Sequence, residues 1–283
     1  MQDIFNFESR HDDYAVMGNP ISHSKSPAIH TRFAAETAEA VNYTAIQVDP
    51  GGFAQAVGNF HAAGGKGLNI TVPFKQEAWS LVDSMSLRAQ RAGAVNTIKF
   101  DDNQLYGDNT DGVGLVNDLV KNNKLELTGK QILLMGAGGA SRGVLIPLLE
   151  QKPALIMIVN RTTDKALDLA NQFSDIGKIR GCGYEALQGK KFDIVINATA
   201  ASLSGEVPPL PSDIFADNGV AYDMMYASEP TSFLKWSALH GAVKNIDGLG
   251  MLVEQAAESF FIWRNVRPET LAVIESLRQE MDG

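Results

Sequence analysis

The sequence predicts an α/β protein made of two α/β domains that flank a cleft. Short apolar runs recur along the chain, and each is followed by a turn and a helical pattern. Strands that alternate with helical segments are typical of βαβ units and of a largely parallel sheet. The length of 283 residues suits one large domain or two. The pattern restarts with a turn and a strong strand near residue 130, which favours two.

The first domain is expected at 1–111 and the second at 112–248. In the first, predicted strands lie at 14–18, 43–48, 67–72 and 94–100, and helical patterns follow at 26–37, 51–63, 74–83 and 111–120. In the second, predicted strands lie at 131–135, 154–160, 192–199 and 219–226, with a turn and helix at 136–150 and a loop at 208–213. Helical patterns at 248–266 and 269–281 end the chain. We expect residues 249–283 to pack back on the first domain and complete it.

Composition excludes several classes of protein. The net charge is −9 and no Lys/Arg cluster is present, so nucleic acid is not an expected partner. Residues 1–13 lack the apolar core of a signal peptide, and the longest apolar runs are far short of a membrane span. Cys182 is the single cysteine, which fits a reducing compartment. We therefore expect a cytoplasmic protein without a membrane partner, and both a monomer and a homodimer stay open.

A glycine-rich turn follows the strand at 131–135 and opens a helix, which is where a dinucleotide fingerprint belongs. Gly136 suits a tight turn, and Gly138 lets the backbone approach a pyrophosphate at the helix N-terminus. Ser141 stands at the third fingerprint position, where Gly or Ala is expected. Even so, strand, turn, helix and next strand occur in order, which predicts a Rossmann-type dinucleotide-binding domain.

The residues after the next strand favour NADP over NAD. An NAD site expects an acid there to hold the ribose 2′-hydroxyl, whereas this chain has Asn160, Arg161 and Thr162, with Lys165 one turn later. Arg161 and Lys165 would attract a 2′-phosphate through charge-assisted hydrogen bonds. A solvated basic turn is the alternative, and Asp164 between the two cations weakens the prediction.

The first domain carries a run of hydroxyls before its first helix. Ser22, Ser24 and Ser26 crowd one turn. Ser26 precedes Pro27, so it is predicted to be the helix N-cap. The remaining hydroxyls could hold a small anion.

The segment "NITVPFKQ" at 69–76 is unusual. Asn69 and Thr71 alternate, so they share one face of a strand end. Pro73 is predicted at the first helical position, which puts Lys75 in the first turn, where the helix dipole disfavours a cation. By itself, Asn96 would be interpreted as an ordinary turn residue. Asp111 by itself would be interpreted as a helix cap.

Together, these segments closely resemble the shikimate dehydrogenase family, and the resemblance spans nearly the whole chain. It covers "GNPISHSKSP", "NITVPFK", "GAVNT", "GDNTDGVG", "GAGGASR", "NRT", "INAT", "YDMMY" and "DGLGMLVEQAA", in the family's order. In that family, the enzyme reversibly reduces 3-dehydroshikimate to shikimate with NADPH, in aromatic amino-acid biosynthesis. The resemblance therefore implies a substrate-binding first domain, an NADP-binding second domain and a small-molecule substrate, with no metal.

The resemblance also implies residue roles. Lys75 and Asp111 would be the catalytic pair, and Ser24 and Ser26 would bind the substrate carboxylate. The other implied substrate-binding residues are Asn69, Thr71, Asn96, Tyr226 and Gln255, with Asp111 also contacting a ring hydroxyl. The implied cofactor-binding residues are Gly136, Ala137, Gly138, Gly139 and Ala140 at the pyrophosphate, Asn160, Arg161, Thr162 and Lys165 at the 2′-phosphate, and Met224 and Gly248 at the nicotinamide.

The chain departs from the family's usual pattern at Gln76, Ala200 to Ser202, Ser232 and Lys165. Lys lacks the bidentate fork of Arg, so Lys165 would hold a phosphate less firmly. A quinate or quinate/shikimate dehydrogenase, a dehydrogenase for an aminoshikimate-type acid, and a non-catalytic relative that senses NADP and a metabolite stay open as alternatives. The intact Lys75 and Asp111 argue against the sensor.

Overall fold

The computed structural model describes residues 11–101, 104–201 and 205–282. The predictions that concern residues 1–10 and Ser202 lie outside these ranges. Contacts divide the chain into two compact units, and each is described by itself. Unit 1 comprises Met1–Gln90, Ala94–Thr110 and Ala256–Val273, and unit 2 comprises Arg91–Gly93, Asp111–Gln255 and Ile274–Gly283.

Unit 1 contains a mixed sheet. Its strands within the described residues are β1 (Asp12–Gly18), β2 (Val41–Gln47), β3 (Gly67–Ile70), β4 (Ser84–Met85), β5 (Thr97–Asp101) and β6 (Gln104–Asp108), in the order β2-β1-β3-β5-β6-β4. The β1–β2, β1–β3 and β4–β6 pairs are parallel, as predicted, whereas the β3–β5 and β5–β6 pairs are antiparallel. The β5–β6 pair must be antiparallel because only two residues separate the strands, and a parallel crossover needs a dozen or more.

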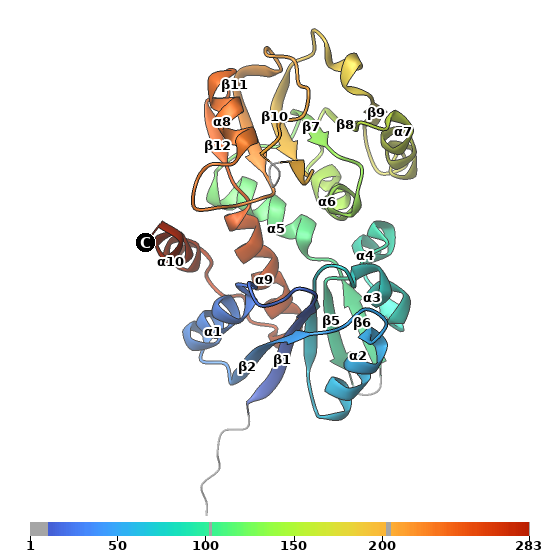
Figure 1. Ribbon diagram of the computed structural model, residues 1–283, viewed down its shortest axis with the longest axis vertical. Helices are drawn as coiled ribbons and strands as arrows, with labels where there is room; N and C mark the ends of the chain where they lie inside the picture. The colour runs from blue at the N-terminus through green and yellow to red at the C-terminus, as the bar shows by residue number, and fades with distance from the viewer. Residues whose placement is uncertain (1–10, 102–103, 202–204, 283) are drawn as a thin grey trace, which may run out of the picture. The chain divides into compact units, whose positions relative to one another are not determined.

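Helices cover both faces of this sheet. The helices are α1 (Ser26–Thr37), α2 (Phe53–Ala62), α3 (Lys75–Leu81), α4 (Leu87–Ala92) and the part of α9 (Leu249–Arg264) that belongs to unit 1. Along β1, Tyr14 and Val16 pack into one cluster with Trp263 of α9, while Ala15 and Met17 pack into another with Phe53 of α2. In Figure 1, α1 and α9 accordingly lie on one side of the sheet, and α2 and α3 on the other.

Two predicted helix starts are wrong by one or two residues. Helix α1 begins at Ser26 itself, and Lys25 occupies the N-cap position without a side-chain cap. The Ser24 hydroxyl instead accepts a hydrogen bond from the Ser26 N–H at 3.3 Å. Helix α3 begins at Lys75 with Phe74 at the N-cap, so Pro73 lies before the helix. Phe74 fixes this start because it is fully buried and stacks on Phe53 at 5.1 Å.

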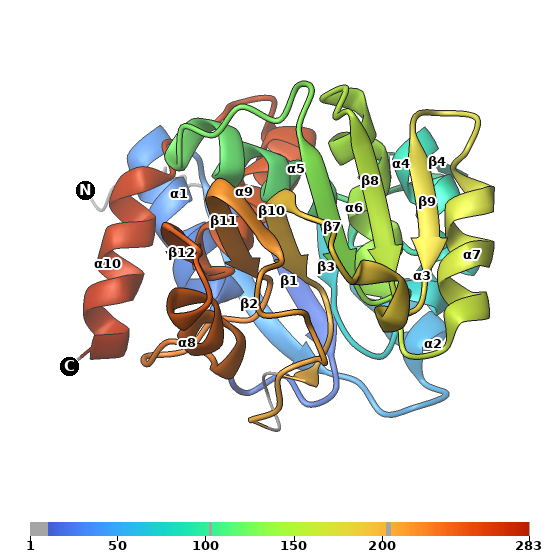
Figure 2. The ribbon, with the colours of Figure 1, turned by 90° about the horizontal axis from the view of Figure 1, so that it is seen from above.

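Unit 2 contains a parallel sheet. Its described strands are β7 (Gln131–Met135), β8 (Leu155–Val159), β9 (Ile179–Cys182), β10 (Phe192–Asn197), β11 (Phe215–Asp223) and β12 (Lys244–Ile246), in the order β12-β11-β10-β7-β8-β9 (Figure 2). With β7 counted as the first strand this is the Rossmann order, in which ligands bind where the order reverses, beside β7 and β10. The sequence patterns missed β9 and β12, which are only 4 and 3 residues long.

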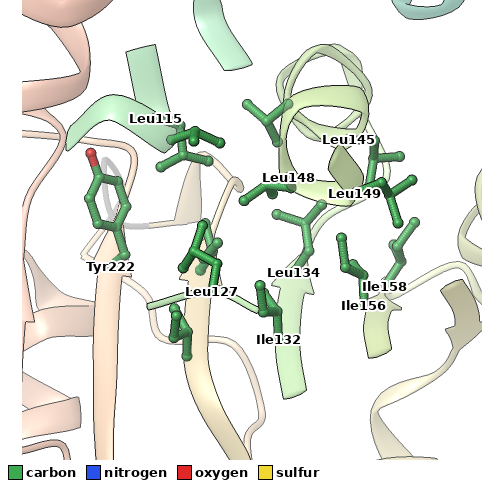
Figure 3. Packing of buried hydrophobic residues seen from close by; sticks show 14 of the residues in the cluster. Leu115, Leu127, Ile132, Leu134, Leu145, Leu148, Leu149, Ile156, Ile158 and Tyr222 are labelled. Atoms are coloured by element: carbon green, nitrogen blue, oxygen red, sulfur yellow. The ribbon is translucent and has the colours of Figure 1, made fainter. Parts of the chain in front are cut away.

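Helices also flank the sheet of unit 2. They are α5 (Asp111–Asn117), which continues as a π-helical turn η1 (Asp118–Asn122), α6 (Gly139–Glu150), α7 (Thr163–Gln172), the 3₁₀ turn η2 (Tyr184–Leu187), α8 (Ser232–Leu239) and α10 (Leu271–Asp282). Figure 3 shows Leu145 and Leu148 of α6 above Ile132 and Leu134 of β7, all in one buried cluster. Leu133 and Met135 face a second cluster. Both faces of the sheet are therefore covered, as a parallel sheet requires.

The end of the chain differs from the predicted domain division. The predicted boundary at 111/112 lies next to the observed boundary between Thr110 and Asp111. Residues 249–255 and 274–282, however, make their contacts in unit 2. Arg278 of α10 holds it there by donating to Asp247 at 2.6 Å and to the Ala227 carbonyl at 3.4 Å. No helix among the described residues is long and apolar enough to cross a membrane.

Candidate active site

In unit 1, Asn69 lies at the centre of a buried polar network. The residue stands on β3 and is only 6% exposed. Its amide nitrogen donates to the Asn96 carbonyl at 3.2 Å and to the Ser259 hydroxyl at 3.0 Å. Its amide oxygen accepts from the Tyr43 hydroxyl at 2.7 Å and lies 3.1 Å from His30 Nε2. The amide nitrogen also donates to the Thr97 hydroxyl at 3.3 Å, so the structure ties Asn69 to β2, α1, β5 and α9.

Asn96 belongs to the same network. Its amide nitrogen donates to the Thr110 hydroxyl at 2.9 Å, and its amide oxygen accepts from the Thr110 N–H at 2.9 Å. The Ser259 hydroxyl lies 2.8 Å from that of Thr97 and 3.3 Å from that of Thr110. The predicted site residues Asn69 and Asn96 are therefore brought together. The supporting hydroxyls of Thr97 and Thr110 stand in "GAVNT" and "GDNTDGVG" but were assigned no role, and Ser259 lies outside every quoted motif.

Thr71 and Lys75 follow β3 directly. The Thr71 N–H donates to the Met17 carbonyl at 3.0 Å, and the Lys75 carbonyl accepts from the Val95 N–H at 2.9 Å. The backbone of Lys75 is thereby joined to the residue before Asn96. The lysine is the first residue of α3, so the predicted placement of a cation in the first helical turn is confirmed.

Residues 108–110, which precede Asp111, are held by their own side chains. Asp108 accepts from Arg88 Nε at 2.7 Å, from Arg88 Nη2 at 2.8 Å and from the Ser86 hydroxyl at 2.5 Å. Asn109 Nδ2 donates to the Ala94 carbonyl at 3.1 Å. Asp111 itself is the first residue of α5 in unit 2. Sequence reasoning missed Arg88, because it lies between the predicted helix at 74–83 and the predicted strand at 94–100, outside every quoted motif.

In unit 2, a pocket of ≈ 660 Å³ opens beside the glycine turn. It lies in the range typical of ligand sites. The residues that line it are Ala137, Gly138, Asn160, Arg161, Thr162, Lys165, Tyr184, Thr199, Ala200, Ala201, Glu206, Val207, Pro208 and Pro209. Ala137 and Gly138 of the glycine turn therefore share one cavity with the predicted residues of the 160–165 turn, whereas Gly136, Gly139 and Ala140 do not line it.

The glycine turn is built for a close approach. Gly136 has a φ of +104°, which side chains rarely adopt, and its N–H donates to the Val159 carbonyl at 2.8 Å. Gly138 and Gly139 have open space where a side chain would begin. Ser141 donates its hydroxyl to the Gly136 carbonyl at 2.8 Å. The unexpected serine thus closes the turn and does not disrupt it.

The 160–165 turn precedes helix α7, with Thr162 at its N-cap. Arg161 and Lys165 are exposed and line the pocket. Asn160 Nδ2 donates to the Thr162 carbonyl at 2.9 Å and shapes the turn. Two cations at a helix N-terminus suit an anion, and these residues fit the 2′-phosphate of NADP.

Eight pocket residues were not among the predicted cofactor residues, and three of these have polar side chains: Tyr184, Thr199 and Glu206. Burial raises the pKa of Tyr184 to about 12, against the opposing charge of Arg161. The tyrosine therefore stays neutral and offers an aromatic wall. Thr199 ends the quoted segment "INAT", which was assigned no role, and Tyr184 and Glu206 lie in no quoted motif.

Met224 and Gly248 are also brought together. The Met224 N–H donates to the Asn197 carbonyl at 2.9 Å, and a side chain at Gly248 would overlap the Met224 carbonyl. Half-buried Tyr226 and Gln255 lie in the same unit, where Gln255 Nε2 donates to the Leu252 carbonyl at 2.8 Å. Unit 2 thus holds the predicted nicotinamide residues in contact with each other.

A parallel sheet in Rossmann order, with a glycine turn and a basic turn around one pocket, defines unit 2 as a dinucleotide-binding fold. Residues 16–98 match the shikimate dehydrogenase substrate binding domain, residues 118–204 match shikimate / quinate 5-dehydrogenase, and residues 248–278 match the shikimate 5'-dehydrogenase C-terminal domain.

Whole-chain comparisons agree with these matches. A relative from Nitrosococcus oceani, named shikimate dehydrogenase (NADP(+)), is 58% identical over 272 residues, which is 96% of each chain. The structure of an Ael1 enzyme from Pseudomonas putida has a TM-score of 0.91 at 47% identity and covers 94% of this chain and 98% of that one. Shikimate 5-dehydrogenase from Thermus thermophilus, in complex with NADP(H) and shikimate, has a TM-score of 0.84 at 31% identity and covers 95% and 99%. The chain belongs to the shikimate dehydrogenase family.

Proposed function

We propose that this protein catalyses the reversible NADPH-dependent reduction of 3-dehydroshikimate to shikimate, in the biosynthesis of chorismate and the aromatic amino acids. The observation that carries the proposal is the 58% identity, over 96% of the chain, to a relative with that name. The basic, glycine-lined pocket of unit 2 supports NADP as its cofactor. A single cysteine and a biosynthetic reaction suit the reducing cytoplasm.

We assign the two roles to the two halves of the chain. Residues 1–111 with the part of the C-terminal helices that belongs to unit 1, Ala256–Val273, would bind the substrate, and residues 112–248 would bind NADP. The proposed substrate-binding residues are Ser24, Ser26, Asn69, Thr71, Asn96, Tyr226 and Gln255. The proposed cofactor-binding residues are Gly136 to Ala140, Asn160, Arg161, Thr162, Lys165, Met224 and Gly248.

Lys75 and Asp111 are the proposed catalytic pair. NADPH, when bound, supplies the hydride that reduces the ketone. The protein must deliver a proton to the oxygen that becomes a hydroxyl, and such a group typically contributes ~10²–10⁴-fold to the rate. Lys75 also stabilises the negative charge that develops on this oxygen, and Asp111 orients the reacting hydroxyl.

One assay panel tests the reaction. Shikimate and quinate are each offered with NADP and with NAD, and the absorbance of the reduced cofactor is followed. We expect turnover with shikimate and NADP, and much less with the other three combinations. Faster turnover of quinate would overturn the substrate, and a preference for NAD would overturn the cofactor.

Replacing Lys75 tests the catalytic pair. In Lys75→Ala we expect kcat to fall by about 10²–10⁴-fold, while calorimetry still detects shikimate binding. Lys66→Ala, at an exposed residue of the same unit, is the control and should keep normal kcat. Near-normal turnover in Lys75→Ala would remove the lysine from the mechanism.

A further inference from the structure

Arg88 lies outside the quoted motifs and the proposed site residues, but it forms an ion pair with Asp108 of the "GDNTDGVG" segment. Its Nε and Nη2 donate to the two carboxylate oxygens of Asp108 at 2.7 and 2.8 Å, a bidentate arrangement. Nη2 also donates to Glu258 at 3.0 Å, and Glu258 accepts from Arg267 at 2.6 Å. The side chains of Arg88 and Asp108 are only 21% and 5% exposed, so water competes little for these bonds.

The ion pair fixes the first residue of a short platform, Asp108–Asn109–Thr110. Asp108 Oδ1 also accepts from the Asn109 N–H at 2.6 Å, which sets the backbone direction after β6. Asn109 Nδ2 is bound to the Ala94 carbonyl at 3.1 Å. Thr110 exchanges hydrogen bonds with Asn96. Each residue of the platform therefore has its own anchor.

The platform has two proposed site residues as direct neighbours. Asp111 follows Thr110 in the chain, and Asn96 is oriented by Thr110. A displacement of about 1 Å at a reacting group can cost a hundredfold in rate. The arginine fork on Asp108 anchors the start of the platform, so the position of Asp111 depends on a side chain that need not touch the substrate.

We propose that Arg88 is a positioning residue, which holds Asp111 and Asn96 in their working places through Asp108 and the platform. The proposal rests on the proposed roles of Asp111 and Asn96. It also explains the choice of arginine: lysine would neutralise Asp108 but could not grip both carboxylate oxygens. The positive charge of a lysine would therefore be insufficient to hold Asp108 in place, and the bidentate guanidinium of Arg88 is the feature that positions it.

The test compares steady-state kinetics of Arg88 variants with a matched control. Arg88→Lys should fold, keep its KM for NADP within about twofold, and lose kcat by about ten- to a hundredfold. The control is Arg264→Met, since Arg264 is 19% exposed and forms an ion pair with Asp12 and Glu39 elsewhere in unit 1. It should lose stability but keep kcat within about twofold.

A second variant separates positioning from stability, because Arg88→Met alone leaves Asp108 buried and unpaired. In the double variant Arg88→Met/Asp108→Asn no unpaired charge remains at position 108, so thermal unfolding should recover relative to Arg88→Met. Its kcat should stay low, because the fork is absent. If kcat recovers together with the melting temperature, or if Arg88→Lys has normal kcat, the positioning role is overturned.

Asp111→Asn distinguishes failure of the inference from failure of the proposed function. If Asp111→Asn lowers kcat while the Arg88 variants do not, Asp111 keeps its catalytic role and only the inference about Arg88 falls. If Asp111→Asn leaves kcat normal, the catalytic pair itself is wrong, and the positioning role falls with it.

Discussion

At the scale of single residues, donor and acceptor chemistry fixes the orientation of Asn69. The Asn96 carbonyl can only accept, so the amide nitrogen of Asn69 must face it. The amide oxygen then faces Tyr43 and His30, which must both donate. His30 is consequently the tautomer with its proton on Nε2. Burial lowers the pKa of His30 to about 3, against the hydrogen bond to Asn69, so the ring stays neutral.

This neutral histidine predicts a loss of stability in mild acid. Between pH 6.5 and 3 the unfolded chain binds a proton at His30 and the folded protein does not, so the unfolding free energy falls as the pH falls. From about pH 7 to about pH 5 the loss is about 2 kcal/mol. In His30→Gln, which stays neutral, this part of the pH dependence should vanish in urea titrations at the two pH values.

The control for this titration is His11→Gln, at an exposed histidine. It should keep the wild-type dependence. Burial also raises the pKa of Asp118, so the folded protein binds a proton there more readily than the unfolded chain, and the unfolding free energy rises as the pH falls. This contribution has the opposite sign to that of His30, but it is the same in the wild type, His30→Gln and His11→Gln. If the unfolding free energy of His30→Gln depends on pH as strongly as that of the wild type, the His30 ring is not held neutral in the folded state.

Arg161 predicts cofactor choice, also at the residue scale. It lines the pocket of unit 2 and carries a charge that a 2′-phosphate needs and a 2′-hydroxyl does not. Arg161→Ala should raise the KM for NADP by about ten- to a hundredfold, the value of a charge-assisted hydrogen bond, and leave the KM for NAD within about twofold. Arg180→Ala, at an exposed arginine on β9, should change neither. Equal losses for both cofactors would place the 2′-phosphate elsewhere.

At the scale of elements, the position of the first turn of α9 is fixed by close packing, which leaves no room for a side chain at Gly250. The Asp118 carboxylate accepts from the Tyr222 hydroxyl at 2.7 Å and lies against Gly250, where any side chain would overlap it. Gly248 is packed equally closely on Met224. Asp118 is the first residue of the π-helical turn η1. This irregular turn therefore helps to fix the position of the regular helix α9.

A pair of glycine substitutions tests this packing. Gly250→Ala should destabilise the protein by about 1–3 kcal/mol, because the new methyl group must displace Asp118. Gly58→Ala is the same change inside helix α2, where nothing lies within 4 Å, and should stabilise by about 0.5–1 kcal/mol. Urea unfolding measures both. If Gly250→Ala and Gly58→Ala change the unfolding free energy in the same direction, Gly250 is not tightly packed.

At the scale of the whole molecule, two units with separate cores should respond separately to ligands. A ligand that binds only the folded state stabilises it by about 2.7 kcal/mol at a hundred times its Kd. We therefore expect NADP alone to slow hydrogen exchange in β7, β8 and β10, and shikimate alone to slow it in β1, β3 and β5. Mass spectrometry of peptic fragments measures both. Protection of the unit 1 sheet by NADP would contradict the assignment of the two halves.

Much of the fold was predictable because local signals were strong. The pattern at 26–37 predicted helix α1 with its start one residue off, and the apolar runs at 131–135 and 154–160 predicted β7 and β8 within one residue. The short strands β4, β9 and β12 were missed because two to four residues carry too little periodicity. The antiparallel β5–β6 pair was missed because the alternation of strands and helices elsewhere in the chain indicated a parallel sheet, although only two residues connect β5 to β6.

The sequence by itself determined the α/β class, the glycine and basic turns, and the candidate residues, since each depends on neighbours in the chain and on motifs in a fixed order. Only the tertiary structure decided which residues support them. Arg88 lies 20 residues from Asp108 and 170 from Glu258, and Asn69 lies 190 residues from Ser259. A buried polar group must find its partner wherever the fold provides one, and no local pattern records that distant choice.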